Sequence, residues 1–174
     1  MTDGAGRLYS FVVAVLPIIT GADTPVLRTP TALVPKVTKD VLHLIRNMEE
    51  TCVHADGLGL AAPQVGQSLR VCIAKINDRL TPLINPRITW RSPAMDDAEE
   101  GCLSLPGVYV HVRRPQSIVV EYTDVKGRAQ ERRLADLDAR VVQHEVDHLD
   151  GVLIVDYVGV DRSRKTEDAR TSGV

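Results

Sequence analysis

The stretch from Asp136 to Asp150 restricts the fold of this chain more than any other part of the sequence. Apolar and histidine side chains recur there at spacings of four, three and four residues: Leu137, Val141, His144 and His148. That spacing is typical of the buried stripe of an amphipathic helix, and Gly151 suits the C′ position that ends one. The sequence therefore predicts a helix over 136–150 whose buried side carries two histidines.

These histidines belong to the sequence His144-Glu145-Val146-Asp147-His148, an HExxH pattern. Side chains four residues apart on a helix have Cβ atoms about 5–6 Å apart, so two imidazoles can bind one metal ion. Glu145 would then lie beside the open side of that ion. A helix with two core histidines and a surface glutamate is the alternative. Because HExxH is rare by chance in a chain of this length, we favour the metal site.

A third metal ligand has to come from upstream of this helix. The only later glutamate is Glu167, in a polar tail, and the continuation typical of metzincin peptidases is absent. Cys102 lies in a glycine-flanked bend, which can present a thiolate and leave the next backbone N–H unpaired. A buried cysteine in a turn is the alternative. The segment 57–64 packs small residues before Gln64, and a tight backbone crossing is its alternative.

Three segments taken together resemble the peptide deformylase family: GLGLAAPQ at 57–64, EGCLS at 100–104 and QHEVDHLDG at 143–151. They match the three motifs of that family in order and spacing. The resemblance runs from about Leu16 to Tyr157. It implies a metal-dependent hydrolase that removes the formyl group from the N-terminal N-formylmethionine of newly made polypeptides and releases formate.

The resemblance also implies a role for each residue that matches a motif. The metal ligands would be Cys102, His144 and His148. Glu145 would act as the acid and base of catalysis, and Gln64 and the backbone N–H of Leu103 would bind the formyl oxygen.

Substrate contacts are expected from the helix face and from the resemblance. Leu137 and Val141 precede His144 on one face of its helix, and with Leu58 they would form an apolar pocket for the methionine side chain. The resemblance adds backbone hydrogen bonds between an extended peptide and three residues: Leu58, Gly59 and Gly101. It also implies that Tyr109 lies near the next side chain of the peptide.

A thiolate with two imidazoles leaves one coordination position open for water, which is typical of a catalytic metal site. This donor set suits Zn²⁺ or Fe²⁺, and the resemblance favours Fe²⁺, with Zn²⁺, Ni²⁺ or Co²⁺ as substitutes. Glu100 is expected to pair with Arg114 and to support the metal ligands from behind. A solvated surface carboxylate is the alternative.

Two other classes of protein compete with this interpretation. A metallopeptidase would need a ligand downstream of the helix, which the sequence does not offer. A zinc-stabilised binding module would need a closed site with four ligands and would have no use for Glu145. Neither class explains the glycine-rich segment before Gln64.

Composition restricts the domain organisation and the partners. With 44% hydrophobic and 25% charged residues, the 174-residue chain is expected to form a single catalytic domain, 1–174, with an N-terminal extension over 1–15 and a polar tail over 158–174. A net charge of −2 gives no basic field for specific nucleic-acid binding. Three cysteines fit a reducing cytoplasm. The partners would be N-formylmethionyl nascent peptides, with a transient ribosome contact, although the tail shows no counterpart of the docking helix of some family members.

The apolar run from Leu8 to Ile19 raises the question of a signal peptide. Asp3 in the leading segment, Pro17 within the run and the lack of a cleavage motif argue against one. The run is also too short to cross a bilayer, which takes about 20 apolar residues. We expect no membrane association and an extended segment or strand against the core.

The remaining elements fit an α+β class. Thr38 is the expected N-cap of a helix with one buried face: Val41, Ile45, Met48 and Cys52. The run 69–74 is predicted to be a buried strand, with Pro82 and Pro86 marking edges or bends after it. Strands over 108–112, 117–123 and 128–134 are predicted to form a β-meander, and the three prolines of 24–35 an ordered loop. We therefore expect mixed or antiparallel sheets around a central HExxH helix, with the N-terminal helix packed outside.

Overall fold

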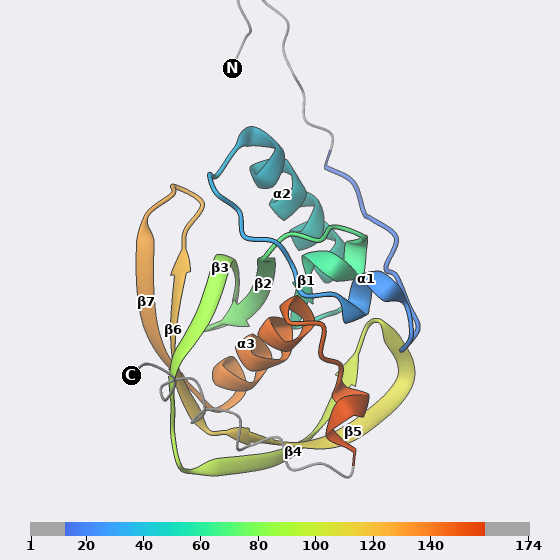
Figure 1. The fold of residues 1–174 in the computed structure, drawn as a ribbon, viewed down its shortest axis with the longest axis vertical. Helices are drawn as coiled ribbons and strands as arrows, with labels where there is room; N and C mark the ends of the chain where they lie inside the picture. The colour runs from blue at the N-terminus through green and yellow to red at the C-terminus, as the bar shows by residue number, and fades with distance from the viewer. Residues whose placement is uncertain (1–12, 159–174) are drawn as a thin grey trace, which may run out of the picture.

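The computed structural model describes residues 13–158, which form antiparallel sheets and two long helices (Figure 1). Its elements, in chain order, are α1 (Pro25–Arg28), α2 (Lys39–His54), β1 (Gly59–Ala61), the 3₁₀ helix η1 (Ala62–Val65), β2 (Val71–Ile76), β3 (Arg79–Arg91), β4 (Met95–Cys102), β5 (Leu105–Pro115), β6 (Ser117–Thr123), β7 (Ala129–Ala135), α3 (Asp136–Leu149) and the 3₁₀ helix η2 (Ile154–Tyr157).

The strands form two separate sheets. Five of them lie in the order β1-β2-β3-β6-β7, and β4 pairs with β5 alone. Neighbouring strands are antiparallel in both sheets. The predicted α+β class with antiparallel sheets is therefore confirmed.

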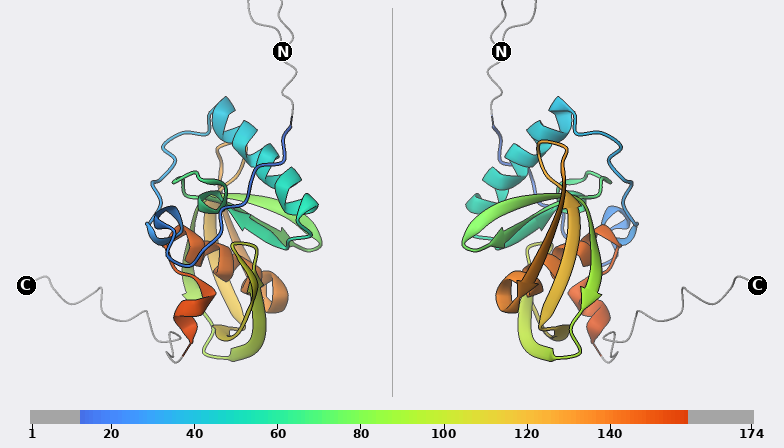
Figure 2. Two further views of the ribbon diagram at one scale, coloured as in Figure 1. Left: turned by 90° about the vertical axis from the view of Figure 1, so that its right-hand side faces the viewer. Right: turned by 90° about the vertical axis from the view of Figure 1, so that its left-hand side faces the viewer.

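Strand β2 is buried on both faces because a helix covers each of them. Cys72, Ala74 and Ile76 pack into the cluster that contains the apolar face of α3. The alternating residues Val71 and Ile73 pack into the cluster that contains α2. This explains the unbroken apolar run that predicted a buried strand. Figure 2 shows α2 on the outer side of the β1–β2 layer and α3 on its inner side.

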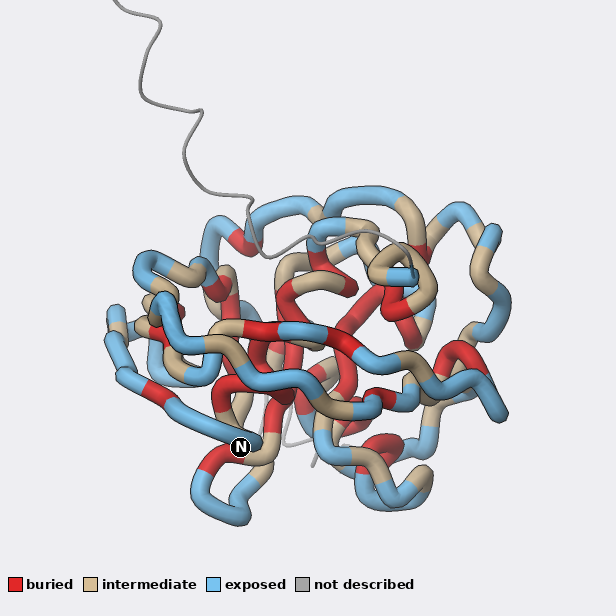
Figure 3. Tube along the Cα trace, turned by 90° about the horizontal axis from the view of Figure 1, so that it is seen from below, coloured by how far each residue is buried: buried red, intermediate tan, exposed pale blue. Residues whose placement is uncertain are grey.

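The two helices follow the expectations from the sequence closely. In α2, the Thr38 hydroxyl accepts a hydrogen bond from the backbone N–H of Val41 at 3.3 Å, as predicted for the N-cap. The buried face of α2 is also the predicted one: Val41, Ile45, Met48 and Cys52. In α3, Gly151 follows the C-cap with a φ of 75°, a conformation that favours glycine. Buried residues gather at the centre of the molecule, seen from below in Figure 3.

One residue of the predicted stripe is exposed to solvent. Leu137, in the first turn of α3, is 56% exposed, whereas Val141 is 7% exposed and His148 only 1%. The stripe begins at an open pocket, so its first residue faces solvent instead of the core.

The predicted β-meander is wrong at its first strand. Residues 108–112 belong to β5, which pairs with β4, whereas 117–123 and 128–134 fall in the paired strands β6 and β7. Only Gln116 lies between β5 and β6, and one residue cannot reverse the chain into a hairpin. The chain therefore passes from one sheet into the other.

The prolines that were predicted to mark strand edges, bends and a loop differ in their effect on the backbone. Pro86 lies between Ile84 and Arg87, where the pairing of β3 with β6 shifts register, so the predicted bend is present. Pro82 lies within β3 opposite Ile73, on the part of the strand that precedes its pairing with β6. The segment 24–35, predicted to be a loop, contains the short helix α1.

The N-terminal segment is extended, one of the two forms expected. Its backbone N–H groups at Ala14 and Leu16 donate to Asn47 Oδ1 at 3.0 Å and Thr51 Oγ1 at 2.8 Å on α2. Most of the predicted extension and tail lies outside the described residues, so that division of the chain stays a prediction. Among the described helices, none combines the length and apolar character that crossing a membrane requires.

Candidate metal centre and active site

The HExxH helix and the end of β4 bring three potential metal ligands together. The ligand atoms of Cys102, His144 and His148 all lie within 4.8 Å of one another. Cys102 Sγ is 3.2 Å from His148 Nε2, and the two imidazole centroids are 5.0 Å apart. The helical spacing of the histidines explains why His144 and His148 lie side by side. The pairing of β4 with β5 brings Cys102 next to them.

The electrostatics of this triad fit a bound cation. Burial lowers the pKa of His148 well below its usual range, so the ring is neutral and its lone pair is available to a metal. Burial also lowers the pKa of His144, but its contacts with Cys102 and Glu100 outweigh burial and raise that pKa to about 10. The surroundings of His144 thus favour a positive charge, and one sulfur with two imidazoles suits a divalent transition metal.

Glu145 lies next to these ligands in a buried setting. Its side chain is 4% exposed, and Oε2 is buried without a hydrogen-bond partner in the described structure. Burial, the largest contribution, raises the pKa of Glu145 to about 7. A carboxyl group with a pKa near neutrality can both accept and donate a proton at physiological pH.

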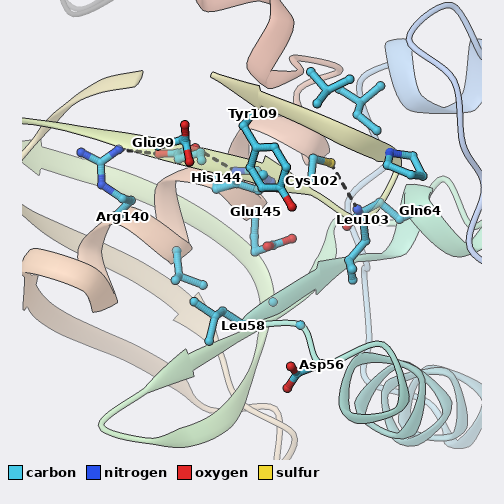
Figure 4. A pocket seen from close by; sticks show the side chains of 18 of the residues that line it. Asp56, Leu58, Gln64, Glu99, Cys102, Leu103, Tyr109, Arg140, His144 and Glu145 are labelled. Carbon is cyan, nitrogen blue, oxygen red and sulfur yellow. Dashed lines mark hydrogen bonds and ion pairs between the residues drawn. The ribbon is translucent and has the colours of Figure 1, made fainter. Parts of the chain in front are cut away.

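Gln64 is fixed by η1 and the strand before it. Its Oε1 accepts a hydrogen bond from the backbone N–H of Ala61 at 2.8 Å. Because the oxygen is used in this way, Nε2 points to Ser104 Oγ at 3.2 Å and to Cys102 Sγ at 3.8 Å. Figure 4 shows Gln64, Cys102 and Leu103 on one side of the pocket, with Glu145 to their left. The amide nitrogen therefore lies beside the triad at Cys102.

Glu100 lies behind the triad and joins it to two arginines. Its Oε2 is 2.9 Å from His144 Nδ1, and Arg114 donates to both carboxylate oxygens at 2.6 and 2.9 Å. Burial alone would raise the pKa of Glu100, but the hydrogen bonds from Arg114 and His144 outweigh it and hold that pKa well below its usual range. The carboxylate is therefore ionised, and the structure brings the predicted Glu100–Arg114 pair together.

Three further residues complete this network and were missed in the sequence. Arg140 donates to Glu100 Oε1 at 2.6 Å, and Asp147 accepts from Arg114 at 2.8 Å and from the Tyr157 hydroxyl at 2.8 Å. Arg140 precedes His144 by four residues, so the helical periodicity that located the histidines could have identified it. No local pattern connects Tyr157 to Asp147, because that contact depends on the return of η2 to α3.

A cavity of about 540 Å³ opens in front of the triad. Among its lining residues are all the predicted substrate contacts: Leu58, Gly59, Gly101, Tyr109, Leu137 and Val141. Gln64, Cys102, Leu103, His144 and Glu145 line it as well. Of the predicted site residues, His148 and Arg114 are not part of the lining and lie behind it, at 1% and 3% exposure.

An open pocket beside three ligands separates this site from a structural metal site, which four protein ligands close. The fold and the site together define a metal-dependent hydrolase. A family model for polypeptide deformylase matches residues 15–164, which extends beyond the Tyr157 limit of the motif-based resemblance. The chain belongs to this family, which is metal-dependent and removes the N-formyl group from nascent polypeptides.

Individual relatives agree with this assignment. The peptide deformylase of Dictyoglomus thermophilum is 48% identical over 144 residues, which cover 83% of this chain and 93% of that protein. The crystal structure of peptide deformylase from Thermotoga maritima matches with a TM-score of 0.78 at 43% identity, over 80% of this chain and 95% of that one. The Met-Ala-Ser-bound enzyme of Acinetobacter baumannii matches with a TM-score of 0.80 at 32% identity, over 84% and 99%.

Proposed function

We propose that this site removes the formyl group from N-formylmethionyl polypeptides with one divalent ion held by Cys102, His144 and His148. The observation that carries this proposal is the buried carboxylate of Glu145, whose Oε2 has no partner in the described structure, beside three convergent ligands. Fe²⁺ is the proposed physiological ion, and Zn²⁺, Ni²⁺ or Co²⁺ would be substitutes. Because nascent chains begin at the ribosome, the proposal includes a transient ribosome contact and a cytoplasmic location.

The ion, when bound, would polarise the formyl carbonyl and make a water molecule more acidic. Glu145 then takes a proton from the attacking water and later delivers it to the leaving amine of methionine. The Gln64 amide and the backbone N–H of Leu103 donate hydrogen bonds to the oxygen on which negative charge develops. Formate and a free N-terminal amine are the products.

The rest of the cavity suits an extended peptide that begins with methionine. Leu58, Leu137 and Val141 offer apolar surface for the methionine side chain. β1 is an edge strand of its sheet, so a peptide can lie along its free side and bond the backbone of Gly59, whereas the carbonyl of Leu58 already accepts from Lys75 of β2. Gly101 would bond the peptide from the opposite wall. The binding of Met-Ala-Ser to the Acinetobacter baumannii relative supports a peptide that begins with methionine as the ligand.

Formate release distinguishes this function from that of a metallopeptidase, the competing class. The experiment incubates the metal-loaded protein with formyl-Met-Ala-Ser and, separately, with unblocked Met-Ala-Ser. We expect one formate for each free Met-Ala-Ser and no cleavage of either internal peptide bond. Cleavage of the unblocked peptide without formate release from the blocked one would contradict the proposal.

A further inference from the structure

Gly59 lies against the carboxylate of Glu145 so closely that no side chain fits between them. A Cβ atom placed on Gly59 would lie 2.8 Å from Glu145 Cδ and 2.9 Å from Cγ, and it would meet Oε1 more closely still. These three atoms of Glu145 are the nearest neighbours of that position. Real Cβ atoms do not approach other heavy atoms to such distances, so a side chain at residue 59 has to displace the carboxylate.

The backbone conformation does not explain this glycine. Within residues 13–158, the glycines with positive φ are Gly21, Gly66, Gly107, Gly127 and Gly151. Gly59 is not among them, and it lies in β1 opposite Ala74 of β2. An alanine can adopt this extended backbone without strain. Glycine at this position therefore serves to leave space for the Glu145 side chain.

Glu145 depends on this space because hydrogen bonds do not hold it. Oε2 is buried without a hydrogen-bond partner, and the described structure gives Oε1 none either. Among the described residues, packing and the α3 backbone therefore position this carboxylate. On the side of β1, the Glu145 carboxylate packs against the backbone of Gly59.

The strand cannot move back to make room for a larger residue. β1 is hydrogen-bonded along its length to β2, and the backbone N–H of Lys75 donates to Leu58 O at 2.8 Å just before Gly59. On the other side of the contact, the carboxylate is the end of a flexible side chain. A methyl group at residue 59 would therefore leave the sheet intact and shift the Glu145 carboxylate.

We propose that Gly59 is a positioning residue for Glu145, and that its missing side chain fixes the carboxylate where it can exchange a proton with the attacking water. This role rests on the proposed function of Glu145. It differs from the backbone contact of Gly59 with the peptide, because it concerns the rate of proton transfer and not the affinity for substrate.

The test compares Gly59→Ala, Glu145→Gln and the double variant on formyl-Met-Ala-Ser. kcat and KM are measured together with Tm and with bound metal by elemental analysis. We expect Gly59→Ala to fold, to keep its metal and to lose about 100-fold in kcat, the size of effect that a displacement of about 1 Å can have. KM should change much less. Adding Gly59→Ala to Glu145→Gln should change kcat little, because proton transfer has already been lost.

Gly101→Ala is the matched comparison on the opposite wall of the cavity. A Cβ on Gly101 would meet the ring of Tyr109 at 3.0 and 3.2 Å and not Glu145, so its effect should fall on KM. A crystal structure of Gly59→Ala should show the carboxylate displaced and the three ligand side chains unmoved.

Several results would overturn the proposal. One is an unchanged kcat in Gly59→Ala, and another is a kcat loss of the same size in Gly101→Ala. The third is that Gly59→Ala lowers kcat by the same factor in the Glu145→Gln variant as in the wild-type protein. If Gly59→Ala does not fold, the double variant Gly59→Ala with Glu145→Asp tests the proposal instead. The shorter aspartate side chain leaves room for the added methyl group. That double variant should fold and bind metal, and its failure would overturn the proposal. Near-normal formate release by Glu145→Gln would overturn the proton-transfer role of Glu145 on which this proposal rests, whereas failure at Gly59 alone leaves that role standing.

Discussion

Glu100 Oε2 lies 2.9 Å from His144 Nδ1, one of the two nitrogens of the imidazole. This hydrogen bond fixes the orientation of the ring and leaves Nε2 to face the metal position. The same carboxylate accepts hydrogen bonds from Arg114 and Arg140. One buried side chain therefore orients a ligand and pairs with two buried arginines.

Glu100→Gln should weaken both metal binding and the fold. Loss of such a supporting group typically lowers metal affinity about 10- to 100-fold. An amide also leaves Arg114 and Arg140 without their shared anion, and breaking a buried ion pair costs about 3–5 kcal/mol. Urea unfolding and a competitive metal titration measure the two effects. Glu121→Gln, which removes an exposed pair with Arg87, is the control and should cost less than about 1 kcal/mol.

Cys102→Ser should lower metal occupancy or change the preferred metal, because a hydroxyl is a harder and weaker ligand than a thiolate. Elemental analysis after dialysis measures this. Cys52→Ser and Cys72→Ser should keep the metal, since both cysteines are fully buried away from the triad. Unchanged metal content in Cys102→Ser would contradict the ligand assignment.

Formyl peptides should react at least about a hundredfold faster than the corresponding acetyl peptides. That ratio corresponds to roughly 3 kcal/mol in the activation barrier. In the proposed binding mode the triad, Gln64 and Glu145 would surround the acyl group, so an added methyl group would crowd the reacting carbonyl. Initial rates on formyl-Met-Ala-Ser and acetyl-Met-Ala-Ser measure the ratio, and comparable rates would contradict the assigned substrate.

Leu137→Ala should lower kcat/KM for formylmethionyl peptides at least about tenfold, since even one methylene in an apolar pocket is worth about that much. The fold should be affected little because Leu137 is 56% exposed. Leu33→Ala provides the control, as Leu33 is 68% exposed and lies outside the cavity. Equal kinetics for the two variants would remove Leu137 from the methionine pocket.

The local parts of this site could be predicted from the sequence. The 3.6-residue period located α3 and its histidines, and the N-cap at Thr38 and the C′ glycine at Gly151 marked helix ends. The helical period and the residues at helix ends both depend only on residues within one or two helical turns. The three motifs, read together, indicated which upstream residues accompany the histidines.

The non-local parts were beyond a single sequence. Cys102 reaches His148 across 46 residues because β4 pairs with β5 in a sheet of its own, and that pairing was not predicted. The same error placed β5 in a meander with β6. Tyr157 joins the network through η2, an element without a periodic pattern. Pairing between distant segments depends on packing that no short window contains.

The measurement that tests the central claim most directly is formate release by Glu145→Gln. An amide of the same shape cannot shuttle a proton, and acid–base groups typically contribute about 10²- to 10⁴-fold in rate. The variant should keep its metal and its Tm, because Glu145 is not a ligand and makes no hydrogen bond in the described structure through the buried Oε2. kcat should fall at least about 100-fold with peptide affinity nearly unchanged. Metal-loaded Glu145→Gln protein that releases formate at a near-normal rate would contradict the role of Glu145 in proton transfer.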